Sequence, residues 1–370
     1  MKKIGMLLLC LFLLQACKES NPQLENNGPN AIEKVPQTVP GNQVATPTKK
    51  IPLLKLNRST FHSVIGWMSN DEILFILTED GDWTVQSYNL STETWKTIYK
   101  TETPIIQGII HPSKEMILLH TSSNSSSAEI QLIHKNGYVV QSLSFESAEI
   151  YMDWHPTNPD LIVFSTFYDD WSYSTFVYDG STQQLKSIEV ENPFVKWYDE
   201  HRLMVFKWGD SSLDGSDLLL YSTADGGTES TEFQHVLDVQ NLGDTMVYVQ
   251  INETQGKFEY HMEQPETGQY FDWNSPAVSN YSEWVVPTFS VVHPTQLIAI
   301  RSKAAGNVDE FDDKGVLSSY SLNGEKRLGE IVDQPIDCSP NGEVCLGGYE
   351  KENWIQLNPF NEQAWLQLIE

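Results

Sequence analysis

The sequence predicts an all-β protein, a β-propeller built from four-stranded blades. Two recurrences indicate this fold: a polar turn returns at a nearly constant interval, and an apolar strand follows each turn. The length agrees, because the roughly 320 residues after Lys50 are too many for one ordinary core and favour two domains or a repeat array.

The repeats are aligned on the apolar residue that precedes each turn. These seven markers are spaced by 43, 44, 43, 42, 53 and 46 residues. After a marker comes a buried strand such as EILFIL, then a third strand such as TVQSYNL, then a fourth such as TWKTIYK. Four strands in each 42 to 46 residues match the period of a propeller blade. The markers are Trp67, Ile110, Trp154, Trp197, Val239, Val292 and Cys338.

The repeat count predicts seven blades between about Phe61 and Glu370, although six remain possible because the 53-residue unit or the terminal units are irregular. A single meander cannot cover both of its faces, whereas blades packed in a ring do so. A pair of β-sandwiches would also give many short strands, but it does not explain the regular spacing. We expect a last strand at Gln363–Ile369 and expect Ile51–Leu56 to join the outer edge of that blade and close the ring.

The first residues resemble the export signal of bacterial lipoproteins. Lys2 and Lys3 precede an apolar run that is too short to span a bilayer, and Leu14-Gln15-Ala16-Cys17 resembles a lipobox. The resemblance implies cleavage before Cys17, acylation of Cys17, and anchoring on the extracytoplasmic face of the cell membrane. The proline-rich segment that follows predicts a disordered tether. The expected organisation is therefore signal peptide 1–16, lipidated cysteine and tether 17–50, and propeller 51–370.

The charge balance excludes some partners. The signal contains two lysines and no acidic residue, so its removal takes the formal charge from −27 to −29. Such a surface repels phosphate backbones and anionic headgroups, and nucleic acid is not an expected partner. Membrane contact should come from the lipid on Cys17.

Two cysteines remain after Cys10 leaves with the signal and Cys17 is acylated. Cys338 and Cys345 flank the turn sequence Ser339-Pro340-Asn341-Gly342, which places them opposite one another on two antiparallel strands. In an oxidising compartment this arrangement favours a disulfide, with two reduced core thiols as the alternative. No histidine nearby in sequence completes a metal site.

Three markers carry a His-Pro pair, at His111, His155 and His293. Because they occupy equivalent turns of different blades, we interpret them as turn-forming residues rather than as a catalytic or metal-binding set. Trp67, Trp154 and Trp197 are interpreted in the same way, as packing between blades.

The turns WMSND, HPSK, HPTNPD and SPNG resemble the turn of TolB-like propeller repeats. With its lipobox and tether, the chain over residues 50–370 is similar in layout to the YqgU-like propeller lipoproteins. That resemblance implies a six-bladed domain and no known activity.

The loops between second and third strands are rich in acidic residues, with sixteen acids against four lysines. In an antiparallel meander these loops share a face with the connections between blades, so one face of the disc should be strongly negative. Either this face is only solvated surface, or it binds a cation or a basic partner. Ligand-binding candidates are the nearby aromatic residues Trp83, Trp171, Trp208 and Phe311. Asp309, Asp312 and Asp313 form a weak candidate Ca²⁺ site, without regular EF-hand spacing and close to Lys314.

The sequence contains no catalytic motif. It lacks Gly-x-Ser-x-Gly, His-Glu-x-x-His and a phosphate loop, and it has no free nucleophilic cysteine with a partner histidine. We therefore assign no catalytic residue and no required cofactor. We expect an interaction module in the cell envelope that binds a protein or glycan. The alternative is a carbohydrate-active enzyme, a glycosidase or lyase, using the channel carboxylates Asp153, Asp238 or Asp337.

Overall fold

The computed structural model describes residues 51–370, except 208, 210, 212, 281 and 311–313. The expected signal peptide, Cys17 and the tether 17–50 lie outside the described residues. The chain divides into two units, Met1–Ala45 and Thr46–Glu370, and all described residues belong to the second.

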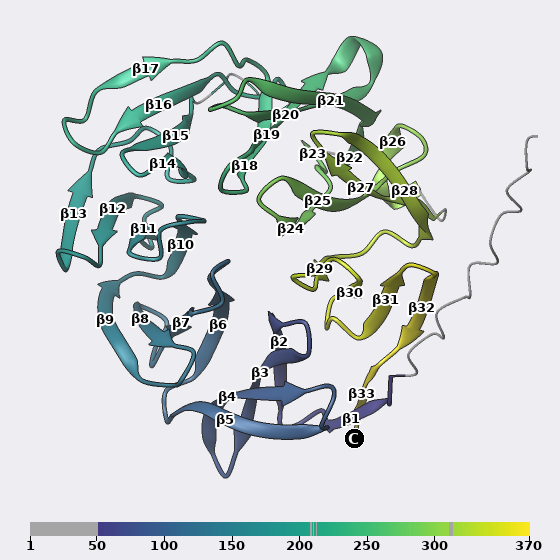
Figure 1. Ribbon diagram of the computed structural model, residues 1–370. Helices are drawn as coiled ribbons and strands as arrows, with labels where there is room; N and C mark the ends of the chain where they lie inside the picture. Colours follow the sequence, from purple (N-terminus) through teal and green to yellow (C-terminus); the bar gives the residue numbers. More distant parts are fainter. Residues whose placement is uncertain (1–50, 208, 210, 212, 281, 311–313) are drawn as a thin grey trace, which may run out of the picture. The chain divides into compact units, whose positions relative to one another are not determined.

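Over the described residues the second unit contains seven four-stranded antiparallel sheets arranged in a ring (Figure 1). Each sheet is one blade, and its strands follow the chain from the innermost to the outermost position. The repeat count of seven is therefore confirmed. The strands of blades 1 to 4 are β2 Phe61–Ser69, β3 Glu72–Glu79, β4 Asp82–Asn89 and β5 Thr94–Thr101; β6 Ile105–Ile110, β7 Met116–Thr121, β8 Ser127–His134 and β9 Val139–Glu146; β10 Glu149–Trp154, β11 Leu161–Phe167, β12 Tyr173–Asp179 and β13 Gln184–Ile188; and β14 Lys196–Asp199, β15 Arg202–Phe206, β16 Leu218–Ser222 and β17 Thr228–Ser230. Those of blades 5 to 7 are β18 Val236–Asn241, β19 Met246–Asn252, β20 Lys257–Gln264 and β21 Gln269–Pro276; β24 Phe289–His293, β25 Gln296–Arg301, β27 Gly315–Ser321 and β28 Gly324–Ile331; and β29 Ile336–Cys338, β30 Val344–Gly347, β31 Asn353–Leu357 and β32 Phe360–Ala364.

The core lies between neighbouring blades. The second strands β3 and β11 each carry an apolar run and are buried along nearly their whole length, because a neighbouring blade covers each of their faces. The outermost strand β5 is mostly exposed. One buried cluster joins blades 1 and 2, where Leu74 and Ile76 pack against Ile117 and Leu119. Similar clusters follow around the ring.

The ring closes differently from the sequence expectation. Instead of one strand over Gln363–Ile369, the chain forms β32 and then β33 Leu366–Ile369, separated at the buried Trp365. β1 Leu54–Asn57 pairs with β33 in parallel, as a separate two-stranded sheet rather than as a fifth strand of blade 7. The break follows from packing, because Trp365 turns into the core between blades 7 and 1, where its ring contacts Phe75 and Trp354.

The irregular 53-residue unit contains an insertion. Between blades 5 and 6 the chain forms β22 Val278–Asn280 and β23 Glu283–Trp284, and β26 Gly306–Asn307 joins them from the second-to-third loop of blade 6. Two 3-10 helices, Glu253–Gln255 and Val308–Glu310, lie in the corresponding loops of blades 5 and 6. The extra residues therefore leave the four strands of blade 5 intact.

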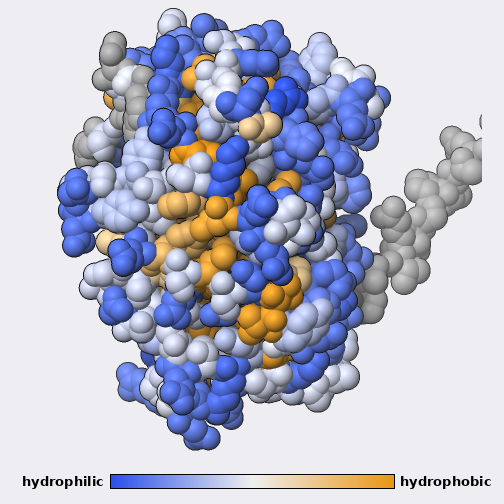
Figure 2. Space-filling model, turned by 90° about the vertical axis from the view of Figure 1, so that its left-hand side faces the viewer, coloured by the Kyte–Doolittle hydropathy of each residue, from blue (hydrophilic) through white to orange (hydrophobic). Residues whose placement is uncertain are grey.

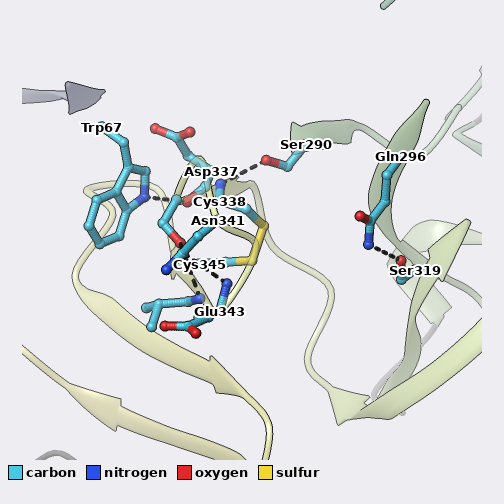
Figure 3. Close-up of a disulfide and its surroundings, with 11 residues drawn as sticks. Trp67, Ser290, Gln296, Ser319, Asp337, Cys338, Asn341, Glu343 and Cys345 are labelled. Atoms are coloured by element: carbon cyan, nitrogen blue, oxygen red, sulfur yellow. Dashed lines mark hydrogen bonds between the residues drawn. A yellow bond between two sulfur atoms is a disulfide. The ribbon is translucent and has the colours of Figure 1, made fainter. Parts of the chain in front are cut away.

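Hydrogen bonds between innermost strands connect the blades. The Trp67 indole Nε1 donates to the Asp337 carbonyl at 2.9 Å (Figure 3). The Trp197 Nε1 donates to the Asp153 carbonyl at 3.2 Å. Both tryptophan side chains are fully buried. Trp154 instead donates to the Pro159 carbonyl of its own turn, and its ring packs on His111 of blade 2. The interpretation of these three residues as packing between blades is confirmed.

The His-Pro histidines stabilise the turns in which they lie. The His111 Nδ1 accepts a hydrogen bond from the Ser113 backbone nitrogen, and the His155 Nδ1 accepts one from that of Asn158. The His293 Nδ1 lies 3.2 Å from the Thr295 hydroxyl. Burial lowers the pKa of both His111 and His155, which keeps these rings neutral at pH 7. The interpretation of these residues as turn-forming is confirmed.

Cys338 and Cys345 are directly opposite one another on β29 and β30, and their sulfur atoms are bonded (Figure 3). Both residues are buried in the cluster between blades 6 and 7. The Cys338 backbone nitrogen also donates to the Ser290 hydroxyl of blade 6 at 2.7 Å. The disulfide thus lies inside the core near the site of ring closure.

Candidate functional site

One residue of each innermost strand occupies the position just before the marker. Four of these seven residues are charged, and three of the four are acidic. Because blades are related by rotation about the ring axis, equivalent residues lie at the same level around that axis. The seven residues are Gly66, Ile109, Asp153, Lys196, Asp238, Val291 and Asp337.

A charged network connects blades 3, 4 and 5 at this level. The Lys196 ammonium lies 2.7 Å from the Asp238 Oδ1 and donates to the Val239 carbonyl at 2.8 Å. The second Asp238 oxygen accepts from the Gln240 side-chain amide at 2.8 Å. The Asp153 Oδ2 accepts a hydrogen bond from the Trp197 backbone nitrogen at 2.8 Å. These side chains therefore hold one blade to the next.

Burial dominates the titration of this network. It raises the pKa of Asp153 to about 6, although the Trp197 N–H and the Lys196 charge act in the opposite direction. The pKa of the neighbouring Tyr151 is also raised, by burial and by the charges of Asp153 and Asp238. The pKa of Asp153 thus lies nearer to neutral pH than that of an ordinary aspartate.

A second network connects blades 7, 1 and 2. The Lys351 ammonium lies 2.8 Å from the Asp337 Oδ2 and donates to the Ile65 carbonyl at 2.8 Å. Lys114 reaches from blade 2 to the Trp67 carbonyl at 3.0 Å, and burial lowers its pKa. Gly66 leaves the space that the Asp337 carboxylate fills, because a Cβ on Gly66 would lie 2.5 Å from the Asp337 Oδ2. The third aspartate is therefore also used in ring closure.

The second-to-third loops and the connections between blades lie on one side of the disc, because the strands of every blade alternate in direction. We call this side the acidic face. Its described second-to-third loops and strand ends carry Glu79, Asp80, Asp82, Glu129, Asp169, Asp170, Asp214, Asp217, Glu253, Asp309, Glu310, Glu350 and Glu352. Few of these acids have a cationic partner; Asp82 pairs with Lys100 and Glu350 with Arg58.

Two aromatic side chains project from the acidic face almost fully into solvent. Trp171, in the β11–β12 turn, is 91 % exposed, and Tyr349, after β30, is 89 % exposed. Trp171 has a positive φ of 67°, and its backbone nitrogen donates to the Tyr168 carbonyl at 2.9 Å. The Asp170 carboxylate accepts from the Ser172 backbone nitrogen and hydroxyl, and these bonds lower the pKa of Asp170. The turn is thus a hydrogen-bonded unit with Trp171 outside it.

The candidate aromatic side chains differ in how much of each is exposed to solvent. Trp83 is half-buried, packed in the cluster between blades 1 and 2, with the His62 ring edge-on at 4.8 Å. The Trp171 side chain is exposed to solvent. Trp208 and Phe311 lie outside the described residues. Tyr349 was not among the candidates, and only its position beside an acidic turn could have indicated it.

The candidate Ca²⁺ site is described only in part. Asp309 lies in the 3-10 helix Val308–Glu310, and its backbone nitrogen donates to the Asn307 side chain at 2.9 Å. Asp312 and Asp313 lie outside the described residues. Among the residues that are described, no group of three or more His, Cys, Asp or Glu side chains has the arrangement of a metal site.

The flank of the disc contrasts with the acidic face. Figure 2 views the side that carries β9, β13 and β17, where polar residues surround a discontinuous apolar band. Exposed apolar side chains of the outermost strands include Val139 and Val140 on β9 and Leu185 on β13.

A ring of four-stranded antiparallel blades that follow one another along the chain defines a β-propeller. The model of the YqgU-like 6-bladed beta propeller domain matches residues 89–348, and the chain belongs to this family. The matched segment begins at the end of β4 and ends just after β30, so it contains five complete blades and parts of the first and last. The family's description gives six blades, whereas the described part of this chain forms seven four-stranded sheets.

The chain is similar along most of its length to the uncharacterized lipoprotein YqgU of Bacillus subtilis (strain 168). The two are 22 % identical over 360 residues, which cover 95 % of this chain and 93 % of that protein. The crystal structure of the uncharacterized protein lmo1340 from Listeria monocytogenes EGD-e superposes with a TM-score of 0.77 at 19 % identity, over 86 % of this chain and 98 % of that one.

A more distant neighbour shares the fold alone. An oligogalacturonate lyase in complex with manganese superposes with a TM-score of 0.52 at 14 % identity, over 79 % of this chain and 86 % of that one. Within residues 51–370, as far as the structure describes them, no helix is both long enough and apolar enough to cross a membrane.

Proposed function

We propose that this protein is a membrane-anchored, extracytoplasmic lipoprotein whose propeller is a recognition module, binding an envelope protein or glycan through its acidic face. The observation that carries the proposal is the exposure of Trp171 and Tyr349 among carboxylates on that face. Aromatic side chains with few packing contacts supply large apolar area to an interface at low entropic cost. The carboxylates around them favour a partner with basic or hydrogen-bond-donating groups.

The anchor in this proposal is an acylated Cys17. Its support is the lipobox-like sequence Leu14–Cys17 together with the similarity to a lipoprotein of Bacillus subtilis along nearly the whole chain. A lipid anchor followed by a polar, proline-rich segment would keep the propeller outside the membrane while the charged surface stays in water.

The alternative is a carbohydrate-active enzyme that uses the innermost-strand carboxylates of Asp153, Asp238 or Asp337. One observation favours it: the pKa of Asp153 is raised to about 6, in the range of a general acid or base. The contacts of the three aspartates favour the binding module instead. Asp238 and Asp337 are each paired with a lysine, and Asp153 accepts a backbone hydrogen bond from the next blade.

A capture experiment from intact envelopes tests the proposal. The full chain and its Trp171→Ala/Tyr349→Ala variant are crosslinked in the envelope and purified, and the bound species are identified. The matched control is Tyr138→Ala, which removes a 57 % exposed aromatic side chain from the β8–β9 turn on the opposite face. We expect one species to be captured by the full chain and the control and lost by the double variant.

The cellular phenotype of these variants, compared with that of variants at the aspartates, separates the two functions. If Asp153→Asn or Asp238→Asn removed the cellular phenotype while the double variant had no effect, the binding proposal would be wrong and the enzyme would be favoured. If neither set of variants mattered, the domain would be a passive spacer.

A further inference from the structure

A cavity of about 380 Å³ lies between blades 3, 4 and 5. Innermost strands supply Tyr151, Lys196 and Asp238 to its wall, and Asn192 and Phe194 come from the connection between blades 3 and 4. Described residues of the β15–β16 loop also line it. That connection belongs to the acidic face, so the cavity lies toward this face, beside the innermost strands. We call it the axial cavity. Its volume is within the range of small-ligand sites.

The walls of the axial cavity combine apolar area with free hydrogen-bonding groups. Phe194 is 47 % exposed, and its ring is held edge-on to Tyr151 at 5.4 Å and stacked on Phe167 at 5.6 Å. Within the described part of the chain, the Tyr151 hydroxyl and the Asn192 Nδ2 have no hydrogen-bond partner. Lys196 uses two of its three N–H donors within the protein. Donors and an acceptor therefore remain available beside an aromatic wall.

The charges of the cavity select the class of ligand. Lys196 and Asp238 are the ionised residues of its described lining, and they neutralise one another at 2.7 Å. A neighbouring cavity near blade 5 is lined instead by Asp214, Glu253 and Glu259, and would attract cations. An anion entering the axial cavity would meet Asp238 and the acidic face, and an amine would meet the Lys196 ammonium. A neutral ligand avoids both costs.

We propose that the axial cavity binds a neutral, hydroxyl-rich ring, of which a pyranose sugar is the common example in cell envelopes. The apolar face of such a ring covers Phe194. Its hydroxyl groups accept from Lys196 and Asn192 and exchange hydrogen bonds with Tyr151 and Asp238. This assignment rests on the proposed function only in that it names a ligand class for the same face. It requires no contribution from Trp171 or Tyr349.

The test uses the full chain in detergent micelles and four defined probes. These are methyl α-D-glucopyranoside and N-acetylglucosamine as neutral rings, glucosamine as the cationic control and glucuronic acid as the anionic control. Binding is detected by saturation-transfer NMR and quantified by calorimetry. We expect the neutral rings to bind and the two charged sugars to bind at least about fivefold more weakly, because one unpaired ionic contact in the cavity has that effect or more.

Variants connect binding to the axial cavity. Tyr151→Phe removes one hydroxyl and keeps the ring, and we expect it to weaken the binding of the neutral sugars about five- to tenfold. Phe194→Leu should weaken binding as well, and Tyr138→Phe on the opposite face should not change it. Circular dichroism and thermal unfolding establish that each variant is folded. A neutral tetrasaccharide that binds more tightly than its monosaccharide identifies a polymer as the source, whereas equal affinities identify a free sugar.

Three results would overturn the assignment: no transfer to the neutral sugars at millimolar concentration, preference for glucosamine or glucuronic acid, or binding that Tyr151→Phe and Phe194→Leu leave unchanged. Failure here is distinguishable from failure of the recognition module, because capture of an envelope partner depends on Trp171 and Tyr349 and is measured separately.

Discussion

The Trp67 indole of the first blade donates a hydrogen bond to the Asp337 carbonyl of the last blade, at 2.9 Å (Figure 3). The Trp197 indole makes the same bond to the Asp153 carbonyl between blades 4 and 3. At these two markers the tryptophan therefore joins its blade to the residue before the marker of the preceding blade, whereas the Trp154 indole bonds within its own turn. At Asp337 the bond contributes to closing the ring.

Trp67→Phe should lower the free energy of unfolding by about 1 to 3 kcal/mol, because it leaves the partly buried Asp337 carbonyl without this donor. Trp95→Phe is the matched control, since Trp95 is 36 % exposed and its indole nitrogen donates to no group in the described residues. We expect the control to lose less than about 1 kcal/mol. Urea denaturation measures both. Equal losses would contradict a specific role for the indole bond.

The Lys196–Asp238 pair should contribute more than a surface ion pair. The side chains of Lys196 and Asp238 are 19 % and 26 % exposed, whereas Lys100, which pairs with Asp82, is 53 % exposed. A double-mutant cycle with Lys196→Met and Asp238→Asn should give a coupling energy of about 2 kcal/mol. The corresponding cycle at Lys100 and Asp82 should give less than about 1 kcal/mol. Coupling energies of the same size would show that the Lys196–Asp238 pair stabilises the fold no more than a surface ion pair does.

Stability should depend on the protonation of Asp153. Because burial raises its pKa from 3.8 to about 6, the folded state binds its proton more tightly than the unfolded state, and stability is lost as pH rises through 6. The groups that act on Asp153 are Trp197 N–H, Lys196 and Asp238. Asp153→Asn removes the titration and can keep the Trp197 hydrogen bond through its carbonyl oxygen.

The free energy of unfolding of Asp153→Asn relative to the native chain should therefore increase between pH 4 and pH 7.5, by up to about 3 kcal/mol. Chemical denaturation at several pH values measures this difference, in which all other titrating groups cancel. A difference that stays constant over this range, or that decreases, would show that Asp153 is not destabilised by its charge.

The disulfide should resist reduction in the folded protein, because Cys338 and Cys345 are both buried. Alkylation after treatment with a reductant should label neither residue until the protein is unfolded. Replacing both by serine should cost about 2.5 kcal/mol, as expected for a closed loop with a sequence separation of seven residues. Mass spectrometry of the labelled protein decides the matter: alkylation of both residues without a reductant would show free thiols.

Much of the fold could be predicted from the sequence because each blade repeats the same local signals. A polar turn after the marker and an apolar second strand recur in all seven units, so the blade number could be counted. The break at Trp365 could not, because Gln363–Ile369 is a continuous strand-like run. Only the core between blades 7 and 1 shows that the indole turns inward.

Less of the candidate site than of the fold could be predicted from the sequence. Trp171 and Trp83 both lie beside an acidic turn, but Trp83 packs against blade 2, a contact between residues far apart in sequence. The Lys196–Asp238 pair is separated by one blade period, and placing the residue before each marker in register around the ring would have indicated it. Phe194 lies in an irregular connection with no periodic signal, so the axial cavity could not be anticipated.

Site-specific photocrosslinking in living cells tests most directly whether the acidic face is the binding surface. A photoreactive phenylalanine is placed at Trp171 or Tyr349 on the acidic face, and at Tyr138 or Ser181 in turns on the opposite face. The account predicts a discrete adduct of the same mass from positions 171 and 349 and none from positions 138 and 181. Adducts confined to the opposite face, or formed equally from all four positions, would contradict it.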